Sequence, residues 1–137
     1  MLELMLDSNV CIRAMRAGGD AIRQWLFAKA DVASLSSIVL HELFVGAELA
    51  ARRDHHKALI GEMAAQLAVV DFDRAAAHHA AGIRADLQRR GALIGGNDML
   101  IAGHARSLEL KLITSDLSDF SRVDGLRCED WLAEDSL

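Results

Sequence analysis

Carboxylates stand at two points of the sequence where a buried strand is expected to end. Asp7 follows the apolar run 2–6, which only Glu3 interrupts, and Asp116 follows the apolar segment 110–114. In open parallel sheets, ligands bind just beyond the carboxyl ends of the strands. Each acid alone also fits a simple helix cap. A chemical role therefore depends on further acids that reach the same edge of the sheet.

Two more acids, Glu42 and Asp98, fall in segments that we expect to be helical. Glu42 lies in "SSIVLHELFVGAEL" at the margin of a wide apolar face, where a carboxylate must be paired, protonated or bound to a cation. Asp98 lies in the first turn of a helix that continues with the apolar "MLIAGHA". The helix dipole favours an anion there, which is the simpler alternative for Asp98. "ITSDLSDF" adds Asp119, three residues after Asp116.

Carboxylates that converge on one crevice repel one another unless a hard cation lies among them. Mg²⁺ prefers oxygen ligands and usually binds one or two carboxylates directly, with water completing its shell. Water on such an ion is acidified and oriented for attack, and the ion offsets charge that develops on a phosphate. The acids therefore predict a metal-dependent site for phosphoryl transfer.

The elements that must position these acids alternate along the chain. Strands are predicted at 2–6, 31–36, 67–72, 110–116 and 126–128, and helices at 8–17, 20–30, 37–51, 52–66, 74–90 and 97–107. We expect Ser8 or Asn9 to cap the first helix, and Asn97 to cap the helix that holds Asp98. Alternating strands and helices predict an α/β fold with a mostly parallel sheet and helices on both faces.

Size and composition favour one soluble domain over residues 1–137. The chain is 52% hydrophobic, yet its longest apolar runs are shorter than the ~20 residues of a bilayer span. We therefore expect a cytoplasmic protein that does not bind a membrane. Cys11 and Cys128 are far apart and form no CxxC motif, so neither a disulfide framework nor a thiolate zinc site is expected.

The charge balance gives two opposing indications about a nucleic-acid partner. A net charge of −5 argues against one, because phosphate binding normally requires a basic face. Twelve of the fifteen cationic residues are arginine, however, and arginine grips phosphates with two parallel donors. A bound metal ion also offsets the negative charge of the acids around it, so the remaining surface can still carry basic patches.

Four sequence blocks together resemble the PIN domain, and most closely the VapC-type toxins of bacterial toxin–antitoxin pairs. The blocks are "MLDSN" at 5–9, "HELFVGA" at 41–47, "IGGNDMLIAGHA" at 94–105 and "ITSDLSDFSRVDGLRCEDW" at 113–131. The resemblance covers nearly the whole chain and implies a PIN-like three-layer α/β/α sandwich. It also implies an endoribonuclease that uses Mg²⁺ or Mn²⁺, cuts RNA, tRNA included, and leaves 5′-phosphate and 3′-hydroxyl ends. A VapB-type antitoxin that blocks the site, homodimers, and contact with operator DNA only through the antitoxin are implied as well.

The resemblance assigns roles to individual positions of this sequence. Asp7 and Asp98 match the principal metal-binding acids, and Glu42 matches the acid that helps to hold metal and water. Asp116 matches the usual fourth acid in "TxD", although some relatives carry an acid at the position of Asp119 instead. The polar positions beside the metal are matched by Ser8, Asn9 and Asn97. The expected metal ligands are therefore Asp7, Asp98 and Asp116, with Glu42 orienting or deprotonating the attacking water.

Two other functions make different demands on the sequence. A phosphoaspartate receiver needs a lysine after a late strand, whereas "KLIT" continues with Ser115 and Asp116 and no lysine follows. A catalytically inactive PIN module that only binds RNA or a partner should have lost at least one metal-binding acid, and none is missing. The sequence therefore favours the endoribonuclease.

Overall fold

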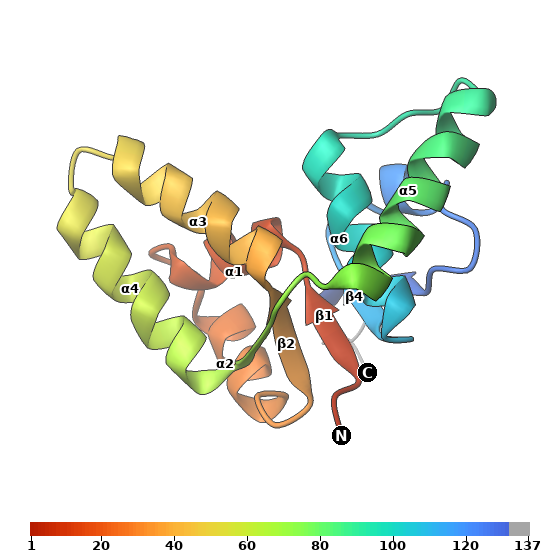
Figure 1. Cartoon of the computed structure of the whole chain (residues 1–137). Coiled ribbons are helices and arrows are strands. Elements are labelled where there is room, and N and C mark those ends of the chain that lie inside the picture. Colours follow the sequence, from red (N-terminus) through yellow and green to blue (C-terminus); the bar gives the residue numbers. More distant parts are fainter. Residues whose placement is uncertain (132–137) are drawn as a thin grey trace.

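A five-stranded sheet forms the centre of the protein, for which a computed structural model describes residues 1–131 (Figure 1). The strand order is β3-β2-β1-β4-β5, and every neighbouring pair is parallel. The strands are β1 (Leu4–Leu6), β2 (Ala33–Ser36), β3 (Ala68–Val70), β4 (Lys111–Ile113) and β5 (Cys128–Glu129). This confirms the predicted α/β fold, with a sheet that is parallel throughout.

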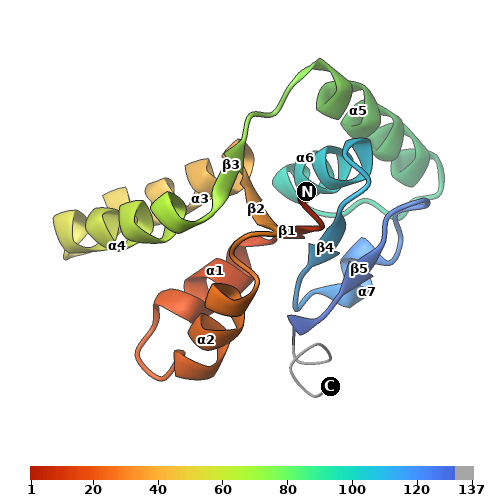
Figure 2. The same cartoon turned by 90° about the horizontal axis from the view of Figure 1, so that it is seen from below.

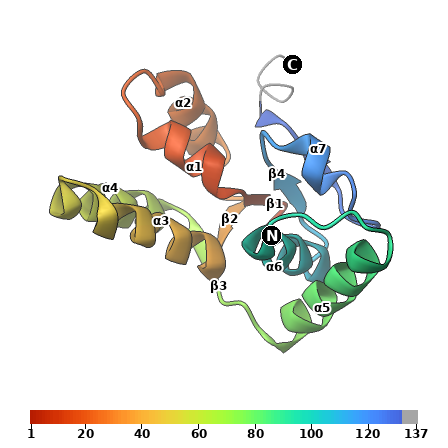
Figure 3. The ribbon, with the colours of Figure 1, turned by 90° about the horizontal axis from the view of Figure 1, so that it is seen from above.

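Helices cover both faces of the sheet. They are α1 (Ser8–Met15), α2 (Asp20–Ala28), α3 (Ser37–Leu49), α4 (Arg53–Gln66), α5 (Arg74–Arg89), α6 (Gly96–Ser107) and α7 (Leu117–Phe120). Figure 3 shows α1 and α2 on one side of the sheet and α5 and α6 on the other, which confirms the three-layer sandwich. Helices α3 and α4 pack side by side and extend beyond the sheet as a hairpin (Figures 1 and 2). Within residues 1–131, no helix is both long enough and apolar enough to cross a bilayer.

The order of the strands determines where a ligand crevice forms. From β1 the chain moves outward to β2 and β3, and then returns to the other side of β1 for β4 and β5. This reversal places a topological switch point between β1 and β4, and open parallel sheets bind ligands beyond such points. Asp7 directly follows β1, and its backbone N–H donates to the carbonyl of Ile113 at 2.9 Å. The first predicted acid therefore lies at this crevice.

The strands beside the crevice are buried on both faces. Met5 and Leu6 of β1, and Leu112 and Ile113 of β4, are all 0% exposed. Burial of apolar side chains contributes roughly 25 cal/mol per Å² of area removed from water. The sheet core thus holds the ends of β1 and β4 in a fixed relation.

Two of the predicted helix caps are wrong. Asp7 itself caps α1, because its Oδ1 accepts a hydrogen bond from the Ser8 N–H at 2.8 Å, so neither Ser8 nor Asn9 is the capping residue. Helix α6 begins at Gly96, one residue before Asn97, and its cap position, Gly95, offers no side-chain hydrogen bond. Helix α1 therefore begins at residue 8, as predicted, but a different residue caps it, whereas α6 begins one residue earlier than predicted.

Two smaller differences concern the last part of the chain. Helix α7 was not predicted, and Asp116 caps it by accepting from the Asp119 N–H at 3.4 Å. The last strand begins at Cys128, not at Leu126, because the Leu126 N–H still donates to the Val123 carbonyl in the turn at Gly125. Gly125 has φ +79°, a conformation that glycine adopts without steric cost.

Candidate metal centre

Asp7 is the most deeply buried acid of the crevice, with 2% of its surface exposed. One carboxylate oxygen accepts from the Ser8 N–H and the other accepts from the Thr114 hydroxyl, each at 2.8 Å. Burial raises the pKa of the Asp7 carboxyl, and the bonds from Thr114 and Ser8 act in the opposite direction. The protein alone therefore fixes the orientation of this carboxylate.

Three further acids gather beside Asp7. One carboxylate oxygen each from Asp98, Asp116 and Asp119 lies within 4.8 Å of the other two. Asp98 comes from the first turn of α6, whereas Asp116 and Asp119 come from the start of α7. Burial, together with the charges of Asp7, Asp116 and Asp119, raises the pKa of Asp98 to about 6. Mutual repulsion of this kind is relieved when a cation binds among the acids.

Glu42 approaches the same crevice from α3. Burial raises the pKa of its carboxyl, and the charges of Asp7 and Asp98 raise it further. Its Oε1 is buried and has no hydrogen-bond partner among residues 1–131. A buried carboxylate oxygen without a partner is costly unless a cation or a water satisfies it.

The donor set fits a hard divalent cation. Every side chain described above offers oxygen, and oxygen ligands are what Mg²⁺ and Mn²⁺ prefer. A cation would satisfy the unpartnered Glu42 oxygen and would offset the carboxylate repulsion that, together with burial, raises the pKa of Asp98. The crevice can thus hold such an ion between α3, α6 and the start of α7.

The other polar residues predicted near the metal differ in their placement. Ser8 is buried, and its backbone N–H binds Asp7. Asn9 and Asn97 are exposed, and neither side chain makes a hydrogen bond within residues 1–131. The structure therefore brings Ser8 to Asp7 but leaves both asparagine side chains at the surface.

Two residues that the sequence prediction missed support the acids. The Thr114 hydroxyl donates to Asp7 and accepts from the Asp116 N–H at 3.0 Å, so one side chain joins the ends of β1 and β4. At Gly95, an added Cβ would lie 3.0 Å from the Asp98 Oδ2, so glycine leaves room for that carboxylate. The hydroxyl residue two positions before Asp116 could have drawn attention to Thr114, but its contact with Asp7 follows only from the pairing of β1 with β4. Nothing local distinguished Gly95 from Gly96.

The comparisons with known proteins agree with this arrangement. Residues 4–126 match the family model described as PIN domain. The chain is 40% identical to the tRNA(fMet)-specific endonuclease VapC of Shigella flexneri over 96% of this chain and 99% of that protein. It is 36% identical to Ribonuclease VapC of Haemophilus influenzae over 96% of this chain and 100% of that protein.

The solved structures give the same result. A chain in the crystal structure of DNA-bound VapBC from Salmonella typhimurium matches with a TM-score of 0.91 and 39% identity, covering 96% of this chain and 99% of that chain. Fold, acid cluster and sequence thus agree, and this chain belongs to the PIN-domain family.

Proposed function

We propose that this chain, as a single PIN domain, is a metal-dependent endoribonuclease toxin of the VapC type that acts on RNA in the cytoplasm. The observation that carries the proposal is the acid crevice, where Asp98, Asp116 and Asp119 lie within 4.8 Å of one another beside the buried Asp7. Such a crevice suits an ion that activates water and neutralises phosphate charge. Relatives of similar length are named as ribonucleases, which supports RNA as the substrate.

The proposed ligands of Mg²⁺, which Mn²⁺ can replace, are Asp7, Asp98 and Asp116. When bound, the ion supplies an acidified water and a positive charge opposite the phosphate. Asp7 offers an oxygen whose direction Thr114 fixes. The pKa of about 6 keeps Asp98 mostly ionised at neutral pH, so it can bind a cation there.

Glu42 is the proposed base for the attacking water. Its raised pKa, caused first by burial, makes it a better proton acceptor than an ordinary exposed glutamate. The water oxygen forms the new bond to phosphorus and one of its protons passes to Glu42, while the bond from phosphorus to the 3′ oxygen breaks. The 3′ oxygen leaves as an alkoxide and takes up a proton from solvent. The products carry a 5′-phosphate and a 3′-hydroxyl.

Asp116 is a better candidate than Asp119 for the fourth acid. Thr114 holds the Asp116 backbone at 3.0 Å and holds Asp7 at the same time. Asp119 is paired with Arg122 at 3.7 Å, which offsets part of its charge. We therefore assign Asp119 a supporting role at the rim of the site.

The proposed partner is a VapB-type antitoxin that blocks this crevice. The similar Salmonella typhimurium chain comes from a DNA-bound VapBC complex, which supports an antitoxin partner for this chain. With a net charge of −5, the chain itself is poorly suited to bind operator DNA, so that contact is assigned to the antitoxin. Homodimers are proposed on the family resemblance.

Cleavage of total RNA by the purified protein tests the proposal. We expect cuts with Mg²⁺ or Mn²⁺, none with EDTA, and none from an Asp98→Asn variant. The matched control is Asp31→Asn, because Asp31 is exposed and precedes β2 at the opposite edge of the sheet. Cleavage that persists both in EDTA and in Asp98→Asn would contradict the proposal. A folded wild-type protein that never cuts RNA would favour a binding module.

A further inference from the structure

A groove leads away from the acid crevice along the hairpin of α3 and α4. It lies between α1, α3 and α4 and has a volume of about 510 Å³. Glu42 lines one part of it, and Arg52 and the first turn of α4 line another. Along α3 the lining runs from Glu42 to Ala47, an advance of roughly 7 Å at about 1.5 Å per residue, and it continues through Ala50 to Arg52. The groove is therefore continuous with the proposed catalytic site and long enough to hold more than the scissile phosphate.

Two arginines face this groove without a partner. Arg16, just after α1, and Arg52, just before α4, both line it and are both exposed. Neither side chain forms an ion pair or hydrogen bond within residues 1–131. Several other arginines are already engaged by acids, namely Arg23 with Asp20, Arg53 with Glu48, Arg90 with Asp86 and Arg122 with Asp119. Free guanidinium groups on one groove are suited to phosphates.

The groove also offers surfaces for unpaired bases. His55 and His56 line it with exposed rings whose centroids lie 5.6 Å apart. Its walls include the apolar side chains of Leu43 and Ile60. Bases that are not in a duplex stack on aromatic and guanidinium planes, whereas the bases of a duplex are already stacked on one another. The lining therefore favours single-stranded RNA over a duplex.

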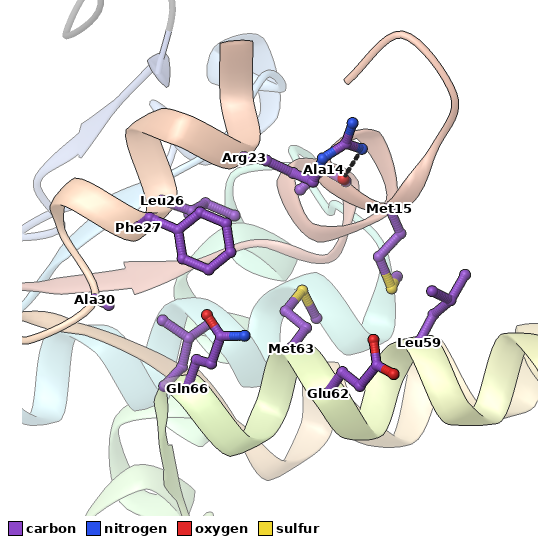
Figure 4. Close-up of a pocket in the computed structure, with 11 residues that line it drawn as sticks. Ala14, Met15, Arg23, Leu26, Phe27, Ala30, Leu59, Glu62, Met63 and Gln66 are labelled. Carbon is purple, nitrogen blue, oxygen red and sulfur yellow. Dashed lines mark hydrogen bonds between the residues drawn. The ribbon is translucent and has the colours of Figure 1, made fainter. Parts of the chain in front are cut away.

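A second groove on the protein differs from the first because the arginine that lines it already has partners. It lies between α2 and α4, has a volume of about 270 Å³, and is lined by Leu26, Phe27 and Met63 among others (Figure 4). Arg23 is the one arginine among the described residues that lines it. The Arg23 guanidinium donates a hydrogen bond to the Ala14 carbonyl at 2.7 Å and forms an ion pair with Asp20. That apolar groove lacks the free cations that distinguish the first groove.

We propose that the groove between α1, α3 and α4 binds the single-stranded RNA segment that adjoins the cleaved bond. Arg16 and Arg52 contact its phosphates, and His55 and His56 stack on its bases. This inference rests on the proposed function, because it extends the same site. Glu42 is the only acid that lines the groove within the described part of the chain, so little opposes the approach of a polyanion beyond the metal centre.

RNA binding by a double variant, Arg16→Ala with Arg52→Ala, tests the inference. The matched control is Arg84→Ala with Arg89→Ala, which removes two exposed arginines that lie on α5 and line a different hollow. Affinity for fluorescent oligouridylate is measured in an Asp98→Asn background, so that the probe is not cut. We expect Kd to rise about tenfold or more for the groove pair, and the salt slope to fall by about 1.4, at about 0.7 per lost phosphate contact.

Steady-state cleavage by the same pairs, with Asp98 intact, separates binding from chemistry. The groove pair should raise KM and leave kcat within about twofold, because it leaves the acids in place. Arg16→Lys with Arg52→Lys should restore part of the affinity, since the charge returns without the two-pronged grip. Thermal unfolding of each variant checks that the fold is retained.

Two outcomes would overturn the inference: RNA affinity equal to wild type in the groove pair, or an equal loss of affinity in the control pair. If the groove pair keeps wild-type RNA affinity and associates more weakly with the VapB-type antitoxin, the groove is assigned to a protein partner. A wild-type protein that cuts no RNA would instead refute the proposed function, so the two failures are distinguishable.

Discussion

Asp7 and Asp98 share one crevice, but the protein supports them in different ways. Asp7 is 2% exposed and accepts hydrogen bonds from Ser8 and Thr114. The carboxylate of Asp98 makes no hydrogen bond within residues 1–131, and its neighbours Asp7, Asp116 and Asp119 repel it. Hydrogen bonds from the protein therefore hold the Asp7 carboxylate in place, whereas the Asp98 carboxylate needs a cation to offset the repulsion from its neighbours.

Alanine substitutions of Asp7 and Asp98 should have the largest effects on activity, and opposite effects on stability. Asp98→Ala and Asp7→Ala should both lower kcat by about 10³-fold, because a metal ion supplies several kcal/mol and ~1.4 kcal/mol is a factor of about ten. Stability of the metal-free protein should change in opposite directions. Asp98→Ala should raise the Tm, since it removes repulsion, whereas Asp7→Ala should cost about 1–3 kcal/mol by leaving the Thr114 and Ser8 donors unpaired.

To test these two variants, kcat for RNA cleavage and the Tm of thermal unfolding in EDTA are measured for each. Asp31→Ala, at the opposite edge of the sheet, serves as the control. A shift of the Tm in the same direction for both variants would show that the two acids are not supported differently.

Removing the Thr114 hydroxyl should have the next largest effect. Thr114→Val deletes the link between Asp7 and Asp116, and loss of a group that orients a metal ligand typically costs 10- to 100-fold in activity. The Thr114 bond lowers the pKa of Asp7, so the variant should raise that pKa and move the acidic limb of the pH–rate profile to higher pH. Thr114→Ser retains the hydroxyl and should behave nearly as wild type. A valine variant with an unshifted profile would refute this role.

The raised pKa of Asp98 should also make the stability of the metal-free protein depend on pH. The pKa of Asp98 is about 6 in the folded protein and 3.8 for an ordinary aspartate, so the folded state binds more protons between these values. Unfolding free energy of the metal-free protein should therefore fall as the pH rises from about 4 to about 6. Urea titrations should show this decline and its loss in Asp98→Asn. A metal-free stability that instead rises through the same window in the wild type, but not in the variant, would contradict the assignment.

The smallest difference concerns the fourth acid. Asp116→Asn should lower kcat about tenfold, because the charge is lost while asparagine still caps α7. Asp119→Asn should lower it less, about threefold, since Arg122 already offsets the Asp119 charge. Rates measured side by side at saturating Mg²⁺ distinguish the two residues. A larger loss of kcat in Asp119→Asn than in Asp116→Asn would make Asp119 the fourth acid of the site.

The sequence predicted what depends on local pattern and missed what depends on distant partners. Alternating apolar runs located the strands, and the acids at their ends indicated the crevice. The choice of Asp7 over Ser8 or Asn9 as cap could not be predicted, because all three residue types are good caps. Thr114 lies 107 positions from its partner Asp7, so only the pairing of β1 with β4 reveals that contact.

A very short helix and a groove formed by several helices could not be predicted from the sequence either. Helix α7 has four residues, which is about one turn and too short to show a periodic pattern. The groove between α1, α3 and α4 combines Arg16 with Arg52, and nothing in the sequence indicates that these two residues meet. Such features exist only after the helices have packed.

Binding of Mn²⁺, followed by electron paramagnetic resonance, tests whether the acid crevice holds a divalent metal ion. Titration with wild-type protein should remove the signal of free Mn²⁺, because the ion enters the crevice between Asp7, Asp98 and Asp116. Asp98→Ala should leave that signal nearly unchanged, while Asp31→Ala should bind as wild type does. Equal Mn²⁺ binding by Asp98→Ala and wild type, or RNA cleavage by a wild-type protein that binds no Mn²⁺, would contradict a catalytic metal site at these acids.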